Sequence, residues 1–154
     1  MAVRKATAAD VEACAALLSA HREQLMAWNP RFWNPSAIAG PMTRAFLGHQ
    51  VQQAETFLVF ERDGVEGFLI ATPAANPPVF DPGGPSVLID DFCVREGALW
   101  PEVGGALLGA AREGWREKGV AQVIAVCADA DAAKKSFLQS QGLATTSVWL
   151  AAPV

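Results

Sequence analysis

A long hydrophobic run is missing from this chain: no stretch of about 18 apolar residues occurs, so no membrane-spanning helix is expected. Residues 1–5 include basic side chains and form no continuous apolar signal segment. Cysteine is scarce, because Cys14, Cys93 and Cys127 are widely spaced and include no CxxC pair. They indicate neither a zinc site nor a disulfide framework, so we expect no bound metal and a cytoplasmic location.

Net charge is small as well. The chain has 12 Lys and Arg against 16 Asp and Glu, a formal net charge of -4, which gives no electrostatic reason to expect nucleic acid or a membrane as partner. Hydrophobic residues make up 51% of the chain and charged residues 18%, which is typical of a compact globule and argues against disorder. A length of 154 residues fits a single domain, residues 1–154.

Local signals place helices and strands along the chain. Thr7 followed by Asp10 resembles a helix-start box, Asp63-Gly64 is a strong hairpin signal, and Gly119 is typical of the residue after a helix. The predicted strands cover residues 2–6, 56–61, 65–71, 86–94, 120–127 and 143–150. The predicted helices cover residues 7–25, 42–54, 101–118 and 130–141, with loops at 28–42 and 73–85. This order predicts an α/β fold with a mixed, mostly antiparallel sheet and flanking helices.

The element order resembles that of the GNAT superfamily of N-acetyltransferases, and the resemblance covers nearly the whole chain. In that family a strand often ending in Val leads into a loop with Arg/Gln-x-x-Gly-x-Gly/Ala, and then into a helix that often begins Ala-Leu-Leu. Here the strand ends at Val94 and the helix carries Ala106-Leu107-Leu108, so both landmarks align without a gap. The resemblance implies a GNAT-like fold that binds acetyl-CoA.

Within that alignment the phosphate loop departs from the family pattern. Leu99 stands at the position of the Arg or Gln, Glu102 at the first Gly, and Gly104 at the second, so only Gly104 matches. The chain therefore resembles a divergent member of the superfamily.

Such a loop aims backbone N–H groups and the positive end of a helix at the pyrophosphate of coenzyme A. The resemblance assigns this role to main-chain groups, and it adds the strand end to the cofactor site. The predicted cofactor-binding residues are Cys93, Val94, Val103, Gly104, Gly105 and Ala106. The alternative is an ordinary helix start, with Pro101 in the first turn and Glu102 complementing the helix dipole.

Acetyl transfer to an amine requires the amine to be neutral, so a base should lie beside it. Asp90 and Asp91 are adjacent carboxylates in an apolar strand, where burial is costly unless they have partners or a function. The run from Ile89 to Val94 is similar to the Glu-Asp-Phe-Phe-Val run of spermidine/spermine acetyltransferases, which places Asp90 at the base-like carboxylate. The alternative is that one carboxylate faces solvent and the other is bonded to a neighbouring loop.

The usual acid of the family is absent. Many GNAT enzymes use a tyrosine in a Tyr-x-x-x-Gly-Phe stretch, and the matching stretch here places Leu138 at that position in a chain without tyrosine. Ser136, Cys93 or water would have to replace it, or the thiolate leaves unassisted, or the protein is not catalytic.

Aromatic side chains gather in the loop at residues 28–42. The resemblance suggests that Trp28, Phe32 and Trp33 form a wall of the acceptor pocket, while structural packing is an equal alternative. His21 and His49 are expected to be a rim histidine and a solvated helix residue.

Three hypotheses follow. The first is acetyl-CoA-dependent acetylation of a primary amine of a small molecule or peptide by direct transfer. The second is a non-catalytic GNAT-like module that binds an acyl-CoA or a partner protein. The third is an unrelated α/β fold in which the glycine pair only permits close packing. The resemblance also suggests a homodimer.

Overall fold

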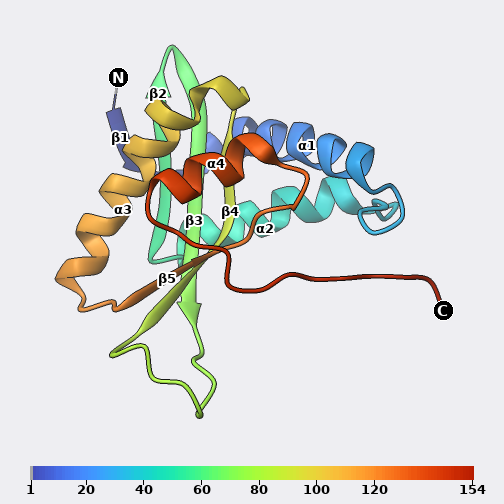
Figure 1. Ribbon diagram of the computed structural model, residues 1–154. Coiled ribbons are helices and arrows are strands. Elements are labelled where there is room, and N and C mark those ends of the chain that lie inside the picture. The colour runs from blue at the N-terminus through green and yellow to red at the C-terminus, as the bar shows by residue number, and fades with distance from the viewer. Residues whose placement is uncertain (1) are drawn as a thin grey trace.

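The computed structural model describes residues 2–154 and shows a central sheet with helices on both of its faces (Figure 1). The strands are β1 (Ala2–Lys5), β2 (Thr56–Arg62), β3 (Gly64–Ala74), β4 (Ser86–Val94) and β5 (Gln122–Ala125). The helices are α1 (Val11–Trp28), α2 (Ala39–Gln53), α3 (Gly105–Glu117) and α4 (Ala132–Ser140). A 3₁₀ turn (Gly97–Leu99) and a π-helical turn (Trp100–Gly104) lead into α3. Within residues 2–154, no helix is both long and apolar enough to cross a membrane.

The sheet is mixed and mostly antiparallel, as the sequence predicts. Its order is β1-β2-β3-β4-β5, with antiparallel pairing through β4 and a parallel pair at β4 and β5. The predicted hairpin at Asp63-Gly64 is confirmed, and Gly64 has the positive φ of 118° that favours glycine. The predicted strand at residues 86–94 is also confirmed with its bounds unchanged.

Two apolar clusters hold the layers together. Residues of α1 and α2, including Cys14, Leu18 and Leu47, pack with Phe68 on one face, whereas residues of α3 and α4 pack with Leu69 on the other. Phe68 and Leu69 are adjacent in β3, so their side chains point to opposite faces and both are fully buried. Burial on both faces explains why the centre of β3 is continuously apolar.

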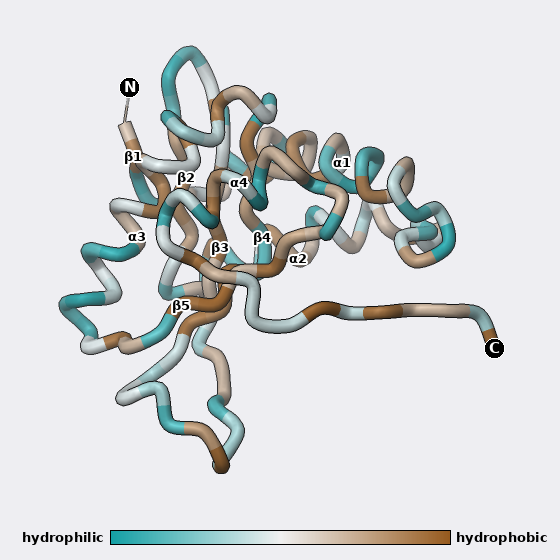
Figure 2. The backbone as a smooth tube through the Cα atoms, viewed as in Figure 1, coloured by the Kyte–Doolittle hydropathy of each residue, from teal (hydrophilic) through white to brown (hydrophobic). Residues whose placement is uncertain are grey.

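The predicted strand at residues 143–150 is wrong: no strand follows α4 in the described chain. Val148, Trp149 and Leu150 are 67%, 87% and 93% exposed, and the segment extends away from the body with its apolar residues uncovered (Figure 2). The alternating pattern favours a strand, but a strand needs a neighbouring edge for its backbone hydrogen bonds, and this segment lies on none.

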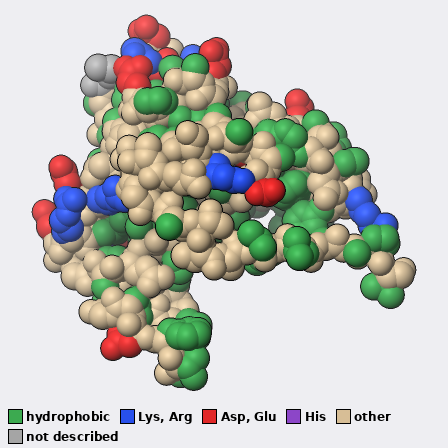
Figure 3. All heavy atoms as spheres, in the orientation of Figure 1, with side chains coloured by type: hydrophobic (Ala, Val, Ile, Leu, Met, Phe, Trp, Pro, Cys, Tyr) green, Lys and Arg blue, Asp and Glu red, His purple; other side chains and the backbone are tan. Residues whose placement is uncertain are grey.

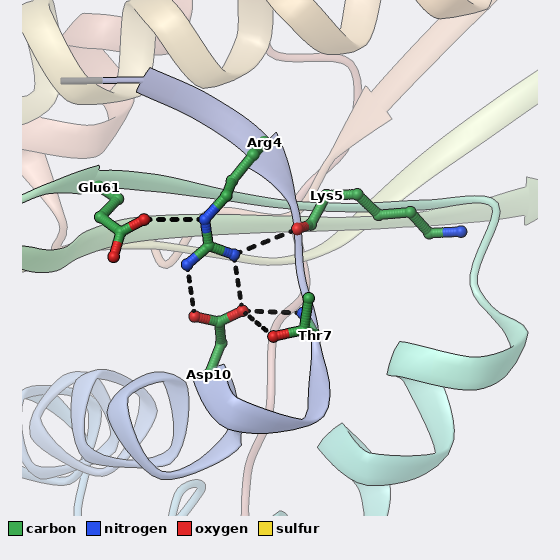
Figure 4. Close-up of polar contacts among 5 residues, drawn as sticks. All are labelled: Arg4, Lys5, Thr7, Asp10 and Glu61. Atoms are coloured by element: carbon green, nitrogen blue, oxygen red, sulfur yellow. Dashed lines mark hydrogen bonds and ion pairs between the residues drawn. The ribbon is translucent and has the colours of Figure 1, made fainter.

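A buried carboxylate connects the start of the first helix to the sheet (Figure 4). Asp10 accepts hydrogen bonds from the Thr7 N–H and hydroxyl at 2.8 and 2.9 Å, so it does what a Glu or Gln usually does in a capping box. The guanidinium of Arg4 donates two hydrogen bonds of 2.8 Å to the Asp10 carboxylate, and its Nε donates to Glu61. The Arg4 hydrogen bonds are the main reason that the pKa of Asp10 is lowered to about 2, against the opposing effect of burial.

We expect Asp10→Asn to lower the free energy of unfolding by about 1–2 kcal/mol at neutral pH, because it removes a carboxylate whose charged form the fold favours. The pKa of Asp10 is lower in the folded chain, so this stabilisation is complete above its unfolded pKa of about 3.9 and is lost as the pH falls toward 2. Urea unfolding of both proteins across this pH range measures the difference. Glu61→Gln, which removes the exposed partner of Arg4, should have a smaller effect; a pH-independent difference for Asp10→Asn would contradict the assignment.

Candidate functional site

The sheet forks at the middle of β4. The parallel pairing with β5 ends at Ile89 and Ala125, whereas β4 continues to Val94 in its pairing with β3. The β3–β4 register shifts at the same point, because Ile70 pairs with Asp91 and Ala71 with Ile89, leaving Asp90 as the extra residue. A β-bulge of this kind bends a strand and strengthens its twist. The bulge therefore lies where β4 separates from β5, and beyond it no strand among residues 2–154 pairs with this edge of β4.

A cavity of about 310 Å³ lies beside the end of β4. Residues of α1, the end of β4, the segment leading into α3, and the start of α4 contribute to its wall. The lining residues are Leu17, Ala20, His21, Gln24, Trp28, Cys93, Val94, Arg95, Gly97, Trp100, Ala130, Asp131, Ala132 and Ala133. Its size is at the lower end of the range for small-ligand sites.

The cavity brings together only some of the residues that the sequence suggested. Trp28, Cys93 and Val94 line it. Phe32 and Trp33 do not; they form an edge-to-face pair with ring centroids 5.0 Å apart, and Phe32 is half exposed. The wall also contains residues ranked low or not considered from the sequence, namely His21, Gln24, Arg95, Trp100 and Asp131.

The two adjacent carboxylates have different surroundings. Asp90 is exposed at the bulge, whereas Asp91 is half-buried. Burial, and next the charge of Asp90, raises the pKa of Asp91 above its ordinary value. A base with a raised pKa is better matched to proton transfer near neutral pH, so the environment favours Asp91 over Asp90 for that role.

His21 is the half-buried histidine of the cavity wall. Burial, followed by the positive charge of Lys134, lowers its pKa below the ordinary value. Its imidazole is therefore neutral at neutral pH and has a nitrogen free to accept a proton. Its place on the apolar stripe of the first helix was the only sequence signal for it.

The predicted phosphate-binding main chain lies inside a continuous helical stretch. The helical turns begin at Gly97 and continue through the π turn into α3, and the Gly105 N–H donates to the carbonyl groups of Trp100 and Glu102. Val103 and Gly104 are buried, whereas Gly105 and Ala106 are half-buried. Binding of a pyrophosphate at residues 103–106 stays a prediction, and the Gly105 N–H would have to give up these bonds to take part in it.

Aromatic side chains pack over the π-helical turn at Trp100–Gly104. The Trp100 ring stacks on Phe137 of α4 at 5.3 Å and meets the edge of Phe92 of β4 at 4.8 Å between centroids. Gly104 fits beneath these rings, because a Cβ there would lie 2.7 Å from Trp100 and 3.2 Å from Phe137.

Ion pairing accounts for the unexpected acidic residue of the turn. Arg62 donates to Glu102 at 2.8 Å and to Glu66 at 2.5 Å. The Glu102 carboxylate is thus paired with a cation, which reduces the repulsion that it would exert on a phosphate group.

Cysteine chemistry has little support. Cys93 is 3% exposed, and burial raises the pKa of its thiol to about 12, so the thiolate needed by a nucleophile is scarce at neutral pH. Burial also raises the pKa of Cys14 to about 12. Among residues 2–154 no group of three or more His, Cys, Asp or Glu side chains is placed to hold a metal ion.

Similarity to known proteins is confined to structure. No protein-family model matches the chain, and no curated protein is similar to it. A mutant of the BH1408 protein from Bacillus halodurans has a TM-score of 0.86 at 19% identity, with 100% of this chain and 99% of that chain covered. The ribosomal-protein-alanine N-acetyltransferase of Brucella melitensis biovar Abortus has a TM-score of 0.64 at 16% identity, with 99% and 96% covered.

A third similar structure is a complex with acetyl-CoA. A predicted acetyltransferase with acetyl-CoA from Clostridium acetobutylicum has a TM-score of 0.68 at 12% identity, with 99% of this chain and 95% of that chain covered. The chain therefore has the fold of these proteins, and the GNAT-like fold expected from the sequence is confirmed.

We expect Gly104→Ala to destabilise the chain by about 1–3 kcal/mol, because the new methyl group would overlap Trp100 and Phe137. Gly105→Ala is the matched control, since no atom lies within 4 Å of its added Cβ and alanine favours a helix. Thermal unfolding of both variants provides the measurement. Equal stability of the two variants would show that the rings do not close over the turn.

The imidazole of His21 should titrate at a lower pH in the folded chain than in the urea-unfolded chain, because burial and Lys134 disfavour its protonated form. The stability from its neutral form is complete above the unfolded pKa of about 6.5 and is lost as the pH falls through the folded value. NMR titration follows this change, with His21→Gln used to assign the signal. A folded pKa at or above the unfolded one would place the ring in solvent instead.

Proposed function

We propose that this chain is an acetyl-CoA-dependent N-acetyltransferase that acts on a primary amine of a small molecule or peptide by direct transfer. The observation that supports it is the cavity beside the end of β4, with Cys93 and Val94 on one side and His21 and Trp28 on another. The GNAT-like fold makes acetyl-CoA the donor to test first.

The edge of β4 suggests how the donor would bind. Beyond Ile89 the main chain of β4 has no strand partner on the side of β5 in the part of the chain that the structure describes, so its N–H and C=O groups can pair with amide groups of an extended ligand. Cys93 and Val94 on this stretch line the cavity. The coenzyme A arm carries such amides, and its thioester supplies an activated acyl group.

Two side chains would manage the proton of the amine. Asp91 has a raised pKa, and the His21 imidazole is neutral, so each can accept a proton directly or through water. His21 lines the cavity itself, whereas Asp91 lies two residues before Cys93 on β4. The acceptor would enter from the side of Trp28, where α1 ends.

A second function is favoured by a specific observation. The Gly105 N–H is already bonded within the helical stretch, and Trp100 and Phe137 cover Gly104. A fold that keeps this turn closed would suit the protein-binding form of a non-catalytic module, whereas the form that binds an acyl-CoA would need the same main-chain groups as the enzyme. The cytoplasmic location and a homodimer remain predictions under either function.

Calorimetric titration with acetyl-CoA, followed by an assay of amine acetylation by mass spectrometry, separates these functions. We expect heat of binding, and an acetylated product with at least one member of a panel of polyamines, aminoglycosides, amino acids and peptides. Detection of the product avoids interference from the three thiols of the chain. Binding without product would leave the non-catalytic module that binds an acyl-CoA, and no binding would refute the enzyme and leave only the module that binds a partner protein.

Paired variants test the base within the same assay. Asp91→Asn should lower kcat by about 100-fold if the half-buried carboxylate takes the proton. Asp90→Asn should have little effect, because its side chain is exposed at the bulge. The reverse result would assign the role to Asp90, as the sequence comparison suggested.

A further inference from the structure

Lys134 on α4 is a buried cation. It is 4% exposed, and among residues 2–154 its ammonium makes no hydrogen bond and no ion pair. The next residue behaves differently, because Lys135 Nζ pairs with Asp129 at 2.6 Å. Charged residues are almost never fully buried unless they are paired, so an unpaired ammonium here requires an explanation.

Two aromatic rings partly explain how an unpaired ammonium can be buried here. The Nζ atom of Lys134 lies 5.6 Å from the ring centroid of Trp100 and 5.9 Å from that of Phe92. The faces of these rings attract a cation, but they accept none of its three N–H donors in the way that an anion does. The hydrogen-bonding capacity of the ammonium is therefore unused in the described chain.

The ammonium is not sealed from solvent. No described side-chain nitrogen or oxygen is both inaccessible and without a hydrogen-bond partner, so the unpaired Nζ must retain accessible surface. Trp100, beneath it, lines the cavity, and so does Asp131, which starts the same helical turn. Lys134 itself is not one of the lining residues, but its ammonium lies beside the part of the cavity wall that Trp100 forms.

The charge of Lys134 affects the pKa of two groups in different parts of the cavity wall, His21 on α1 and Cys93 on β4. It is the largest charge effect on the pKa of His21 and on that of Cys93, after burial in each case. The other titratable or charged groups around it are Arg22 on α1, Asp91 on β4, Cys127 after β5, and Asp131 and Lys135 on α4.

We propose that Lys134 stabilises the sulfur that leaves the thioester, and so supplies the assistance for which this chain has no tyrosine. This inference rests on the acetyltransferase function proposed above. In the step, the nitrogen of the neutral amine bonds to the carbonyl carbon while the C–S bond breaks. The sulfur keeps the electron pair beside the Lys134 ammonium, and the surplus proton of the amine passes to His21 or Asp91.

The Lys134 ammonium would assist the reaction more by pairing with a thiolate that forms during the step than by pairing with a carboxylate that is always charged. Its negative charge develops only as the C–S bond breaks, so an ammonium that is unpaired beforehand interacts more strongly with the transition state than with the substrate. The alternative is that Lys134 is a core residue, stabilised by the rings and without a ligand.

The test compares Lys134→Met with Lys134→Arg, and Lys135→Met is the control on the same helix. Methionine is close in size to lysine and removes only the charge, so the fold should be kept, as thermal unfolding will show. The first readout is the ultraviolet absorbance of the thiolate of free coenzyme A bound to each protein, followed against pH. We expect the bound thiol to ionise at a lower pH in the wild type, Lys134→Arg and Lys135→Met than in Lys134→Met.

The second readout is the dependence of rate on the leaving group. Lys134→Met should lower kcat with acetyl-CoA by about 100-fold. The loss should shrink for a thioester of a more acidic thiol, which needs less assistance to leave. A merely structural lysine would lower both rates by the same factor.

Each outcome decides between the claims. Equal ionisation of the bound thiol in wild type and Lys134→Met overturns the role of Lys134, even if the wild type acetylates amines. No binding of coenzyme A to the wild type overturns the proposed function, and the inference with it. A lower ionisation pH that depends on Lys134 supports the inference whether or not the amine acceptor has been found.

Discussion

The packing of Trp100 between Phe137 and Phe92 is the interaction on which the site depends. It joins three segments that are distant in sequence: the end of β4, the π turn before α3, and α4. Aromatic pairs of this kind are worth about 0.5–1.5 kcal/mol each beyond their buried area. The same indole forms part of the cavity wall, covers Gly104, and provides a face for the Lys134 ammonium. Removing it would alter all three features together.

The cavity and the closed turn together determine which groups of the site could recognise an anion. A helix offers free N–H groups in its first turn, and the helical stretch here begins at Gly97–Leu99, ahead of residues 103–106. Gly97 lines the cavity. On the face shown in Figure 3, acidic and basic side chains are interspersed, so that face presents no large patch of one sign. Recognition of an anion would therefore depend on groups within the cavity more than on long-range attraction.

Local patterns were sufficient for much of the fold. The Asp63-Gly64 hairpin, the bounds of β4, and the start of the first helix at Thr7 and Asp10 follow from signals a few residues long. The strand expected at residues 143–150 failed because its pattern specifies a conformation but not a neighbouring edge.

The site was harder to predict for the same reason. Lys134 belongs to a short helix on which a lysine is ordinarily solvated, and its burial depends on Trp100, which comes from a separate part of the chain. The bulge at Asp90 is likewise set by pairing with β3 and leaves no mark in the order of residues. The family resemblance suggested Cys93, Val94 and Trp28, which line the cavity, but not the groups opposite them.

Gly104 carries a further consequence. A residue without a side chain is what a phosphate would need in order to reach the backbone, and it is equally what the indole above it needs in order to lie flat. The same glycine therefore leaves room for either a phosphate or an indole, but not for both at once. Its presence in this chain, or in any chain aligned with it, is therefore uninformative about ligand binding unless the aromatic residue three or four positions earlier is considered with it.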